Sequence, residues 1–186
     1  EIFAKGNVAT EGLSHPEAFI RARSLALWQE RGDNATATIS DMIEGTMALD
    51  DLDLIGQARL TKHTRRFLEY FLQPKWFQTA ATLGHAKLFF ADFQPGKTRE
   101  VSALDGFKFS DPKLREYFCY LLLDFVTTDP ELEDMPLVAA LNLSRQLEMD
   151  AQFEKFAAKE LKMKIRDVRK LKDQAVELLA KAEVAP

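Results

Sequence analysis

The chain has 186 residues, a mass of 21.1 kDa and a formal net charge of −4. This length can bury a substantial hydrophobic core, which excludes a disordered chain, and the negative charge gives no reason to expect a nucleic-acid partner. Leu and Ala number 25 and 23, against 7 Val and 6 Ile, and unbranched side chains lose less entropy in helices than β-branched ones. We therefore expect an all-α protein, an irregular bundle of about seven to eight helices with one short β-hairpin in the middle loop.

The first residues do not have the pattern of a secretory signal. The sequence begins at Glu1 rather than Met, and residues 1–13 lack the long apolar run of a secretory signal. We expect a fragment or a processed chain that is cytoplasmic. The most apolar window, residues 117–126, is much shorter than the roughly 20 residues that a membrane-spanning helix needs. We therefore expect a buried central helix there and no transmembrane segment.

Two helices are predicted before residue 50. Ser14 and Glu17 have the spacing of a capping box, which opens a helix that ends near Arg31. The inner stripe of this helix is predicted to hold Ile20, Ser24, Leu27 and Trp28. A short helix over residues 39–43 follows, before an acidic turn.

Two further helices are predicted before residue 93. The first begins at Thr61 or Lys62 and ends at Pro74, and its inner face comprises Thr64, Phe67, Leu68, Phe71 and Leu72. The second covers residues 76–90, and its inner face comprises Phe77, Ala80, Ala81, Gly84 and Leu88. Beyond it, turns at Pro95-Gly96 and Asp105-Gly106 frame the expected hairpin, which runs through Val101 and residues 107–109.

The most regular helical pattern follows residue 110. Asp111 and Pro112 open a helix with apolar residues at helical spacing, namely Leu114, Tyr117, Phe118, Leu121, Leu122 and Phe125. Asp129 and Pro136 mark the start of the next, whose apolar face comprises Leu137, Ala140, Leu141, Ser144 and Leu147. Asp150 caps another, and a final helix follows it directly, with an apolar series of Leu161, Ile165, Val168, Leu171, Ala175, Leu178 and Ala182.

This pattern divides the chain into a helical segment over residues 1–93, a loop or linker over 94–110 and a C-terminal helical bundle over 111–186. The alternative is one domain, in which the first segment packs against the bundle.

No reaction centre can be recognised in the sequence. A zinc hydrolase needs closely spaced ligands, whereas His15, His63 and His85 lie far apart, and we interpret them as surface or capping residues. Cys119 lies among aromatic and aliphatic residues, which hide a thiol and raise its pKa, so we expect a core residue. The acids of residues 129–134 lack the glycine of a calcium-binding EF-hand loop and are interpreted as a helix-entry cluster. We expect no catalytic residue, metal ligand or cofactor in this chain.

Residues 159–172 form a basic stretch with seven cations, against the two acids Glu160 and Asp167. Two interpretations stay open: solvated charges on the outer face of the final helix, or a surface that docks phosphate. The candidate binding residues are Lys162, Arg166 and Arg169. We expect the fold to tolerate their neutralisation.

Three segments resemble one known family. Residues 14–23, Ser14-His15-Pro16-Glu17-Ala18-Phe19-Ile20-Arg21-Ala22-Arg23, are similar to a segment of zinc peptidases related to HtpX and the CAAX prenyl endopeptidase. In that family the Ser/Thr-His-Pro segment and its Arg-bearing helix close the catalytic domain. Residues 42–57 and 87–93 resemble the sequence that follows this helix in soluble bacterial members.

The resemblance implies a peptidase domain that precedes Glu1 and carries the H-E-x-x-H helix and the later glutamate ligand. No catalytic residue is then carried over to this chain, and zinc is implied for the parent protein alone, as a metalloendopeptidase. The chain itself is expected to be a non-catalytic accessory, substrate-restricting or partner-binding region. Its expected partners are the missing peptidase domain and a further protein.

A second resemblance offers an alternative function. Residues 111–161 are similar to TerB-like helical domains, through the helical pattern and the acids of residues 129–134. The alternative is therefore an independent TerB-like interaction module of the stress response.

Overall fold

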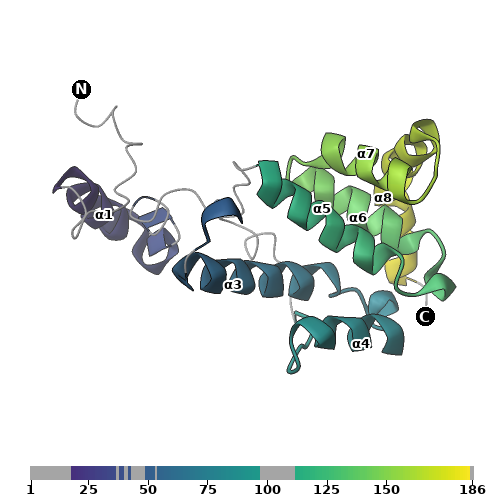
Figure 1. Cartoon of the computed structure of the whole chain (residues 1–186), viewed down its shortest axis with the longest axis horizontal. Coiled ribbons are helices and arrows are strands. Elements are labelled where there is room, and N and C mark those ends of the chain that lie inside the picture. Colours follow the sequence, from purple (N-terminus) through teal and green to yellow (C-terminus); the bar gives the residue numbers. More distant parts are fainter. Residues whose placement is uncertain are drawn as a thin grey trace.

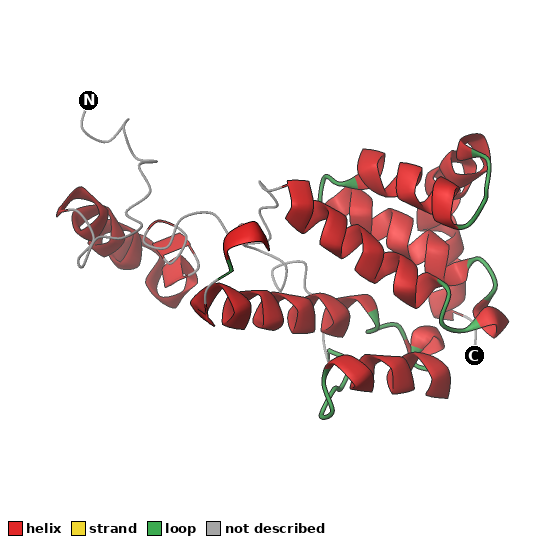
Figure 2. Ribbon diagram, in the orientation of Figure 1, coloured by secondary structure: helices red, strands yellow, loops and turns green. Residues whose placement is uncertain are grey.

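The computed structural model describes residues 18–36, 38, 39, 42, 49–52, 54–96 and 112–184. Within these ranges every regular element is an α-helix or a short 3₁₀ turn, and no β-strand is present (Figure 1, Figure 2). The all-α class predicted from composition is therefore confirmed. The two strands of the hairpin predicted within residues 94–110, its turn at Asp105-Gly106 and most of the short helix predicted at 39–43 lie outside the described residues.

The first described element is α1 (Ala18–Arg31), which leads into the 3₁₀ turn η2 (Gly32–Ala35). It ends where the sequence predicts, because Gly32 has a φ of 56°, a left-handed conformation that favours glycine. Ile20 and Leu27 are buried, but Trp28 is exposed, so its predicted inward position is wrong. Successive side chains of a helix point about 100° apart. Trp28 therefore points away from the face on which Leu27 is buried.

Helix α3 (Leu54–Phe71) follows the 3₁₀ turn η3 (Leu49–Asp51) and runs through the middle of the molecule (Figure 1). It begins earlier than predicted, but its inner face is confirmed, since Thr64, Phe67, Leu68, Phe71 and Leu72 are all buried. The 3₁₀ turn η4 (Lys75–Phe77) then leads to α4 (Ala80–Phe89). The chain returns to α3, where the Gly96 N–H donates to the Glu69 carbonyl oxygen at 2.9 Å. A Cβ at residue 96 would stand 3.0 Å from that oxygen, which favours glycine there.

The inner face predicted for the second of these helices, α4, is wrong except for Phe77. Phe77 is buried, whereas Ala80, Ala81, Gly84 and Leu88 are exposed, and Thr82 and Ala86 are buried instead. The reason is the helix start: Thr79 is the N-cap, and its hydroxyl accepts a hydrogen bond from the Thr82 N–H at 3.2 Å. The Thr82 hydroxyl donates to the Phe77 carbonyl oxygen, which satisfies the buried polar group and directs Thr82 and Ala86 toward the core.

Four helices pack together as a bundle at the other end of the molecule from α1 (Figure 1). They are α5 (Pro112–Val126), α6 (Met135–Gln146), α7 (Asp150–Glu160) and α8 (Ile165–Val184), with the 3₁₀ turn η6 (Pro130–Leu132) before α6. The predicted stripe of α5 is confirmed, since all its residues are buried except the half-buried Tyr117. None of the described helices is long and apolar enough to cross a membrane.

The apolar series of α8 is confirmed in part. Val168 and Ala175 are buried and Leu171 is half-buried, but Ile165, at the start of α8, is exposed. The chain reverses between α7 and α8 at residues 161–164. The two helices therefore form an antiparallel pair, and Ile165 lies beside the turn instead of in the core.

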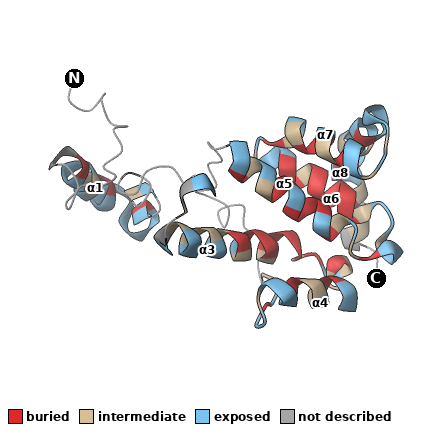
Figure 3. Ribbon diagram, viewed as in Figure 1, coloured by how far each residue is buried: buried red, intermediate tan, exposed pale blue. Residues whose placement is uncertain are grey.

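One cluster of buried side chains joins the two helical parts of the chain (Figure 3). It takes residues from α3 and α4 as well as from α5 to α8. The ring of Phe67 on α3 lies 4.8 Å from that of Phe118 on α5, measured between centroids. Beside them, the hydroxyl groups of Thr64 and Tyr117 share a hydrogen bond of 2.9 Å. Residues 54–96 and 112–184 therefore share a hydrophobic core, whereas the buried residues of α1 lie outside this cluster.

Candidate functional site

The described histidines lie on different helices. His63 is on α3 and half-buried, and His85 is on α4, where its Nε2 lies 2.7 Å from Oδ2 of Asp124 on α5. The imidazole of His85 also packs edge-on against Phe125, with ring centroids 5.0 Å apart. The structure therefore uses His85 to join α4 to α5, while His15 lies outside the described residues. In the described ranges, no group of three or more His, Cys, Asp or Glu residues is placed to hold a metal ion.

Cys119 is a core residue, as the sequence predicts. It is fully buried on α5, and burial, together with the charge of Glu116, raises the pKa of the thiol to about 12. The nucleophilic form of a cysteine is the thiolate, so the folded chain keeps this thiol in its unreactive form.

We predict that Cys119 reacts with iodoacetamide at least about a hundredfold more slowly in the folded chain than in the unfolded chain, at mildly alkaline pH. The expected cause is the near absence of thiolate together with burial of the sulfur. Mass spectrometry of timed samples, with and without denaturant, measures both rates. Equal rates would show that the α5 core opens readily, contrary to the buried position of the thiol.

The acidic residues of two turns have structural partners. Asp129 is the N-cap of η6: its Oδ1 accepts from the Glu131 N–H at 3.1 Å, and its Oδ2 accepts from the Thr79 hydroxyl at 2.6 Å. The interpretation of residues 129–134 as a helix-entry cluster is confirmed for Asp129. In the other turn, Asp50 forms an ion pair with Lys113 of α5.

A group of four interacting charges joins α7 to α8. Glu154 is only 4% exposed, and its carboxylate accepts hydrogen bonds from Arg169 Nε at 2.9 Å and from Lys172 Nζ. Lys172 also donates to Oδ2 of Asp150 at 3.0 Å. We call Asp150, Glu154, Arg169 and Lys172 the α7–α8 charge cluster. It gives the buried carboxylate two cationic partners, which is the condition under which a buried charge is tolerated.

The pKa values of this cluster follow from its contacts. Burial opposes ionisation of Glu154, but the hydrogen bonds from Lys172 and Arg169 outweigh it and lower the pKa of the carboxyl below its ordinary value of 4.5. The hydrogen bond from Lys172 likewise lowers the pKa of Asp150 below 3.8. Hydrogen bonds to Glu154 and Asp150 raise the pKa of Lys172. All three groups are therefore charged at neutral pH, and the cluster fixes α7 against α8.

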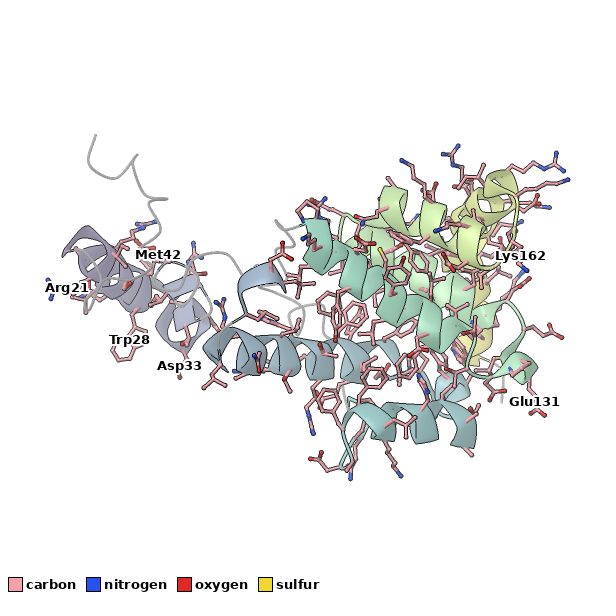
Figure 4. All side chains as sticks on the ribbon, viewed as in Figure 1. Arg21, Trp28, Asp33, Met42, Glu131 and Lys162 are labelled. Atoms are coloured by element: carbon pink, nitrogen blue, oxygen red, sulfur yellow. The ribbon has the colours of Figure 1, made fainter. Side chains whose placement is uncertain are left out.

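The structure separates the three candidate binding residues. Lys162 lies in the turn between α7 and α8 and is exposed, as Figure 4 shows, and Arg166 is exposed on the first turn of α8. Among the described residues, Arg166 forms an ion pair of 3.4 Å with its neighbour Asp167. Arg169 differs, because it is a partner of the buried Glu154. The expectation that neutralisation leaves the fold intact therefore suits Lys162 and Arg166, but Arg169 also contributes to the packing of α7 and α8.

Sequence reasoning missed the α7–α8 charge cluster, although a signal for it exists. In an antiparallel helical hairpin, residues at equal distances from the turn face each other. Asp150 and Glu154 lie 11 and 7 residues before the turn, and Lys172 and Arg169 lie 8 and 5 residues after it, so the outer acid and the outer cation are both the more distant member of their pair. The two acids are neighbours on one face of the first helix, and the two cations are neighbours on one face of the second. Once the chain reversal is placed at residues 161–164, this spacing predicts contacts between the acids and the cations.

A second surface is apolar and lies on α1. Leu25 is 63% exposed and Trp28 is 55% exposed, and residues three apart are neighbours on a helix surface. Figure 4 shows Trp28 projecting away from the helix. The helical pattern places Trp28 on the inner stripe, whereas the expected contact with an absent peptidase domain implies an exposed apolar patch within residues 1–28, the range in which this pair lies.

Comparison of the chain with protein-family models, with curated proteins and with solved structures finds no match. The class that the structure defines is an all-α bundle with an apolar pair on α1 and a basic turn between α7 and α8.

Proposed function

We propose that this chain is a non-catalytic accessory domain of a bacterial, cytoplasmic zinc-dependent peptidase of the HtpX-related group. In this proposal it binds the peptidase domain through α1. The observation that carries the proposal is the exposed apolar pair of Leu25 and Trp28 on a helix whose other face already buries Ile20 and Leu27. The first part of α1, residues 18–23, belongs to the segment 14–23 whose sequence resembles the helix that closes the catalytic domain of that family, and Leu25 and Trp28 follow it on the same helix.

The position of α1 supports this role. It packs against η2 and lies outside the buried cluster that the other helices share. A Trp and a Leu on adjacent turns form a small apolar surface, and tryptophan is among the residues that contribute most to binding at protein interfaces. A peptidase domain that continues into α1 would cover this surface without any rearrangement of the α5–α8 bundle.

The test is binding between this chain and a separately produced peptidase domain, encoded upstream in the same reading frame. Leu25→Ser with Trp28→Ser is expected to weaken this binding about thirtyfold or more, because loss of one interfacial hot-spot residue alone costs about 2 kcal/mol. Calorimetric titration measures the affinity. The matched control is Val176→Ser, which changes a side chain of α8 that is 60% exposed and should leave the affinity unchanged.

Two results contradict the proposal. An upstream reading frame without an H-E-x-x-H helix would remove the peptidase and favour the TerB-like interaction module. Equal affinities of the double variant and the unchanged chain would show that α1 is not the contact surface.

A further inference from the structure

The turn between α7 and α8 carries a dense group of cations. Lys159, Lys162, Lys164, Arg166, Arg169 and Lys170 are all exposed, and the segment 159–170 contains only two acids, in a chain whose net charge is −4. The turn projects from the outer end of the bundle (Figure 1). We call Lys162, Lys164, Ile165, Arg166 and Lys170 the basic corner.

The charges of the basic corner are available to a partner. In the described part of the chain, Lys162, Lys164 and Lys170 make no ion pair or hydrogen bond through their side chains. The carboxylates nearest in sequence, Glu160 and Asp167, are 3.4 Å from Lys159 and Arg166 respectively, in exposed pairs of little energetic value. A partner of negative charge would therefore displace mainly water from these side chains.

An apolar side chain lies among these cations. Ile165 is 37% exposed at the start of α8, in the sequence Lys162-Met163-Lys164-Ile165-Arg166, where basic and apolar residues alternate. Met163 packs against the core, so Ile165 is the apolar residue that the corner presents outward. A lipid bilayer surface accepts both kinds of group, because its phosphates attract cations and the region just beneath them accepts apolar side chains.

We propose that the basic corner docks the chain on an anionic lipid surface, with Lys162, Lys164, Arg166 and Lys170 near the lipid phosphates and Ile165 at the acyl boundary. The rest of the chain carries an excess of acids, which an anionic surface repels. Electrostatic attraction therefore orients this corner, rather than another face, toward the lipid surface. Nucleic acid also carries phosphate, but its bases stack on aromatic side chains. The large apolar residue exposed at this corner is the aliphatic Ile165, which favours a lipid surface over nucleic acid.

The backbone conformation at Lys162 allows a substitution that removes one positive charge and preserves the fold. Lys162 has a φ of 55°, and the N–H of Met163 donates to the Ala158 carbonyl oxygen at 3.0 Å, which is the pattern of a Schellman motif at the end of α7. Glycine is the residue that this position favours. Lys162→Gly therefore keeps the turn and removes a cation.

The matched control comes from the end of α6. Glu148 has a φ of 56°, and Met149 donates there to the Ser144 carbonyl oxygen at 2.9 Å, so Glu148→Gly repeats the backbone change in a similar turn. It removes an acid instead of a cation and leaves the basic corner intact.

The experiment is co-sedimentation of the chain with vesicles of phosphatidylcholine alone, and with vesicles in which phosphatidylglycerol replaces about a third of it. We expect binding to the anionic vesicles only, with a loss of binding as salt is raised. Lys162→Gly with Arg166→Gln is expected to weaken it about thirtyfold, since each cation contributes about fivefold near such a surface. Glu148→Gly should bind at least as well as the unchanged chain.

Ile165→Ser separates lipid docking from simple attraction between charges. It is expected to weaken binding to anionic vesicles about tenfold, because the side chain no longer transfers from water into an apolar region. Inorganic phosphate and an oligonucleotide, at the same phosphate concentration as the vesicles, should compete poorly. Binding to neither vesicle, equal binding to both, no loss in the double variant or no loss in Ile165→Ser would each overturn the proposal, as would full displacement by the oligonucleotide or by phosphate.

Discussion

Phe118→Ala is expected to lower the free energy of unfolding by about 3 to 5 kcal/mol. Phe118 is fully buried on α5, and its ring contacts that of Phe67 on α3. Its removal leaves a cavity where the two helical parts of the chain meet. Because packing in a core relaxes only partly around a cavity, the loss exceeds the transfer free energy of the ring. Urea unfolding followed by circular dichroism measures the change.

The control is Tyr120→Ala on the same helix. Tyr120 is exposed and makes an edge contact with Phe156, so its loss is expected to cost about 1 kcal/mol. A double-mutant cycle between Phe67 and Phe118 should give a coupling energy of about 1 kcal/mol. If residues 54–96 and 112–184 folded independently, unfolding would occur in two steps and Phe118→Ala would change only one of them.

Lys172→Met is expected to destabilise the fold by about 3 kcal/mol at neutral pH, because it leaves the buried carboxylate of Glu154 with Arg169 as its remaining cation. Replacement of both residues, Glu154→Leu with Lys172→Met, should recover much of this loss, since a well-packed apolar pair can replace a buried ion pair. Urea unfolding of the two variants and the unchanged chain measures both effects.

The effect of Lys172→Met should depend on pH. Glu154 and Asp150 have lowered pKa values in the folded chain, so their contribution to stability is present above 4.5 and 3.8 and is lost as the pH falls through the folded values. Below that window Glu154 is protonated and needs no cation, and the difference between variant and unchanged chain should shrink. A difference that stays constant with pH would show that Lys172 acts through packing of its aliphatic chain alone.

Lys181→Met is the matched control for this prediction. Lys181 pairs with Glu177 at 2.7 Å on the same helix, but both side chains are 70% exposed. An exposed pair of this kind contributes about 0.5 kcal/mol or less. The contrast between Lys172 and Lys181 therefore separates burial of the partner carboxylate from the charge change itself.

The sequence predicts the long regular helices best, and the reason is their periodicity. The stripe of α5 and the inner face of α3 follow from apolar residues that recur over several turns, and the structure confirms both. The inner face of α4 was wrong, because one side-chain cap at Thr79 decides which residues of a short helix face inward. Helical spacing alone carries no information about such a cap.

The candidate site was harder to predict than the core. Arg169 and Arg166 lie close together in the sequence, yet one contacts a buried carboxylate of α7 and the other does not. This difference depends on where the chain reverses, and the continuous apolar series from Leu161 to Ala182 hides the turn at residues 161–164. Trp28 and Ile165 show the same limit, since an apolar residue at the edge of a stripe or at a helix start can face water.

The most direct test of the proposed function compares the full product of the gene with this chain. Zinc content and peptidase activity are measured for both, on the same unstructured protein substrate. We expect bound zinc and activity in the longer product and neither in this chain, as for an accessory domain of a peptidase. Stoichiometric zinc with activity in this chain alone, or the absence of both from the longer product, would contradict the account.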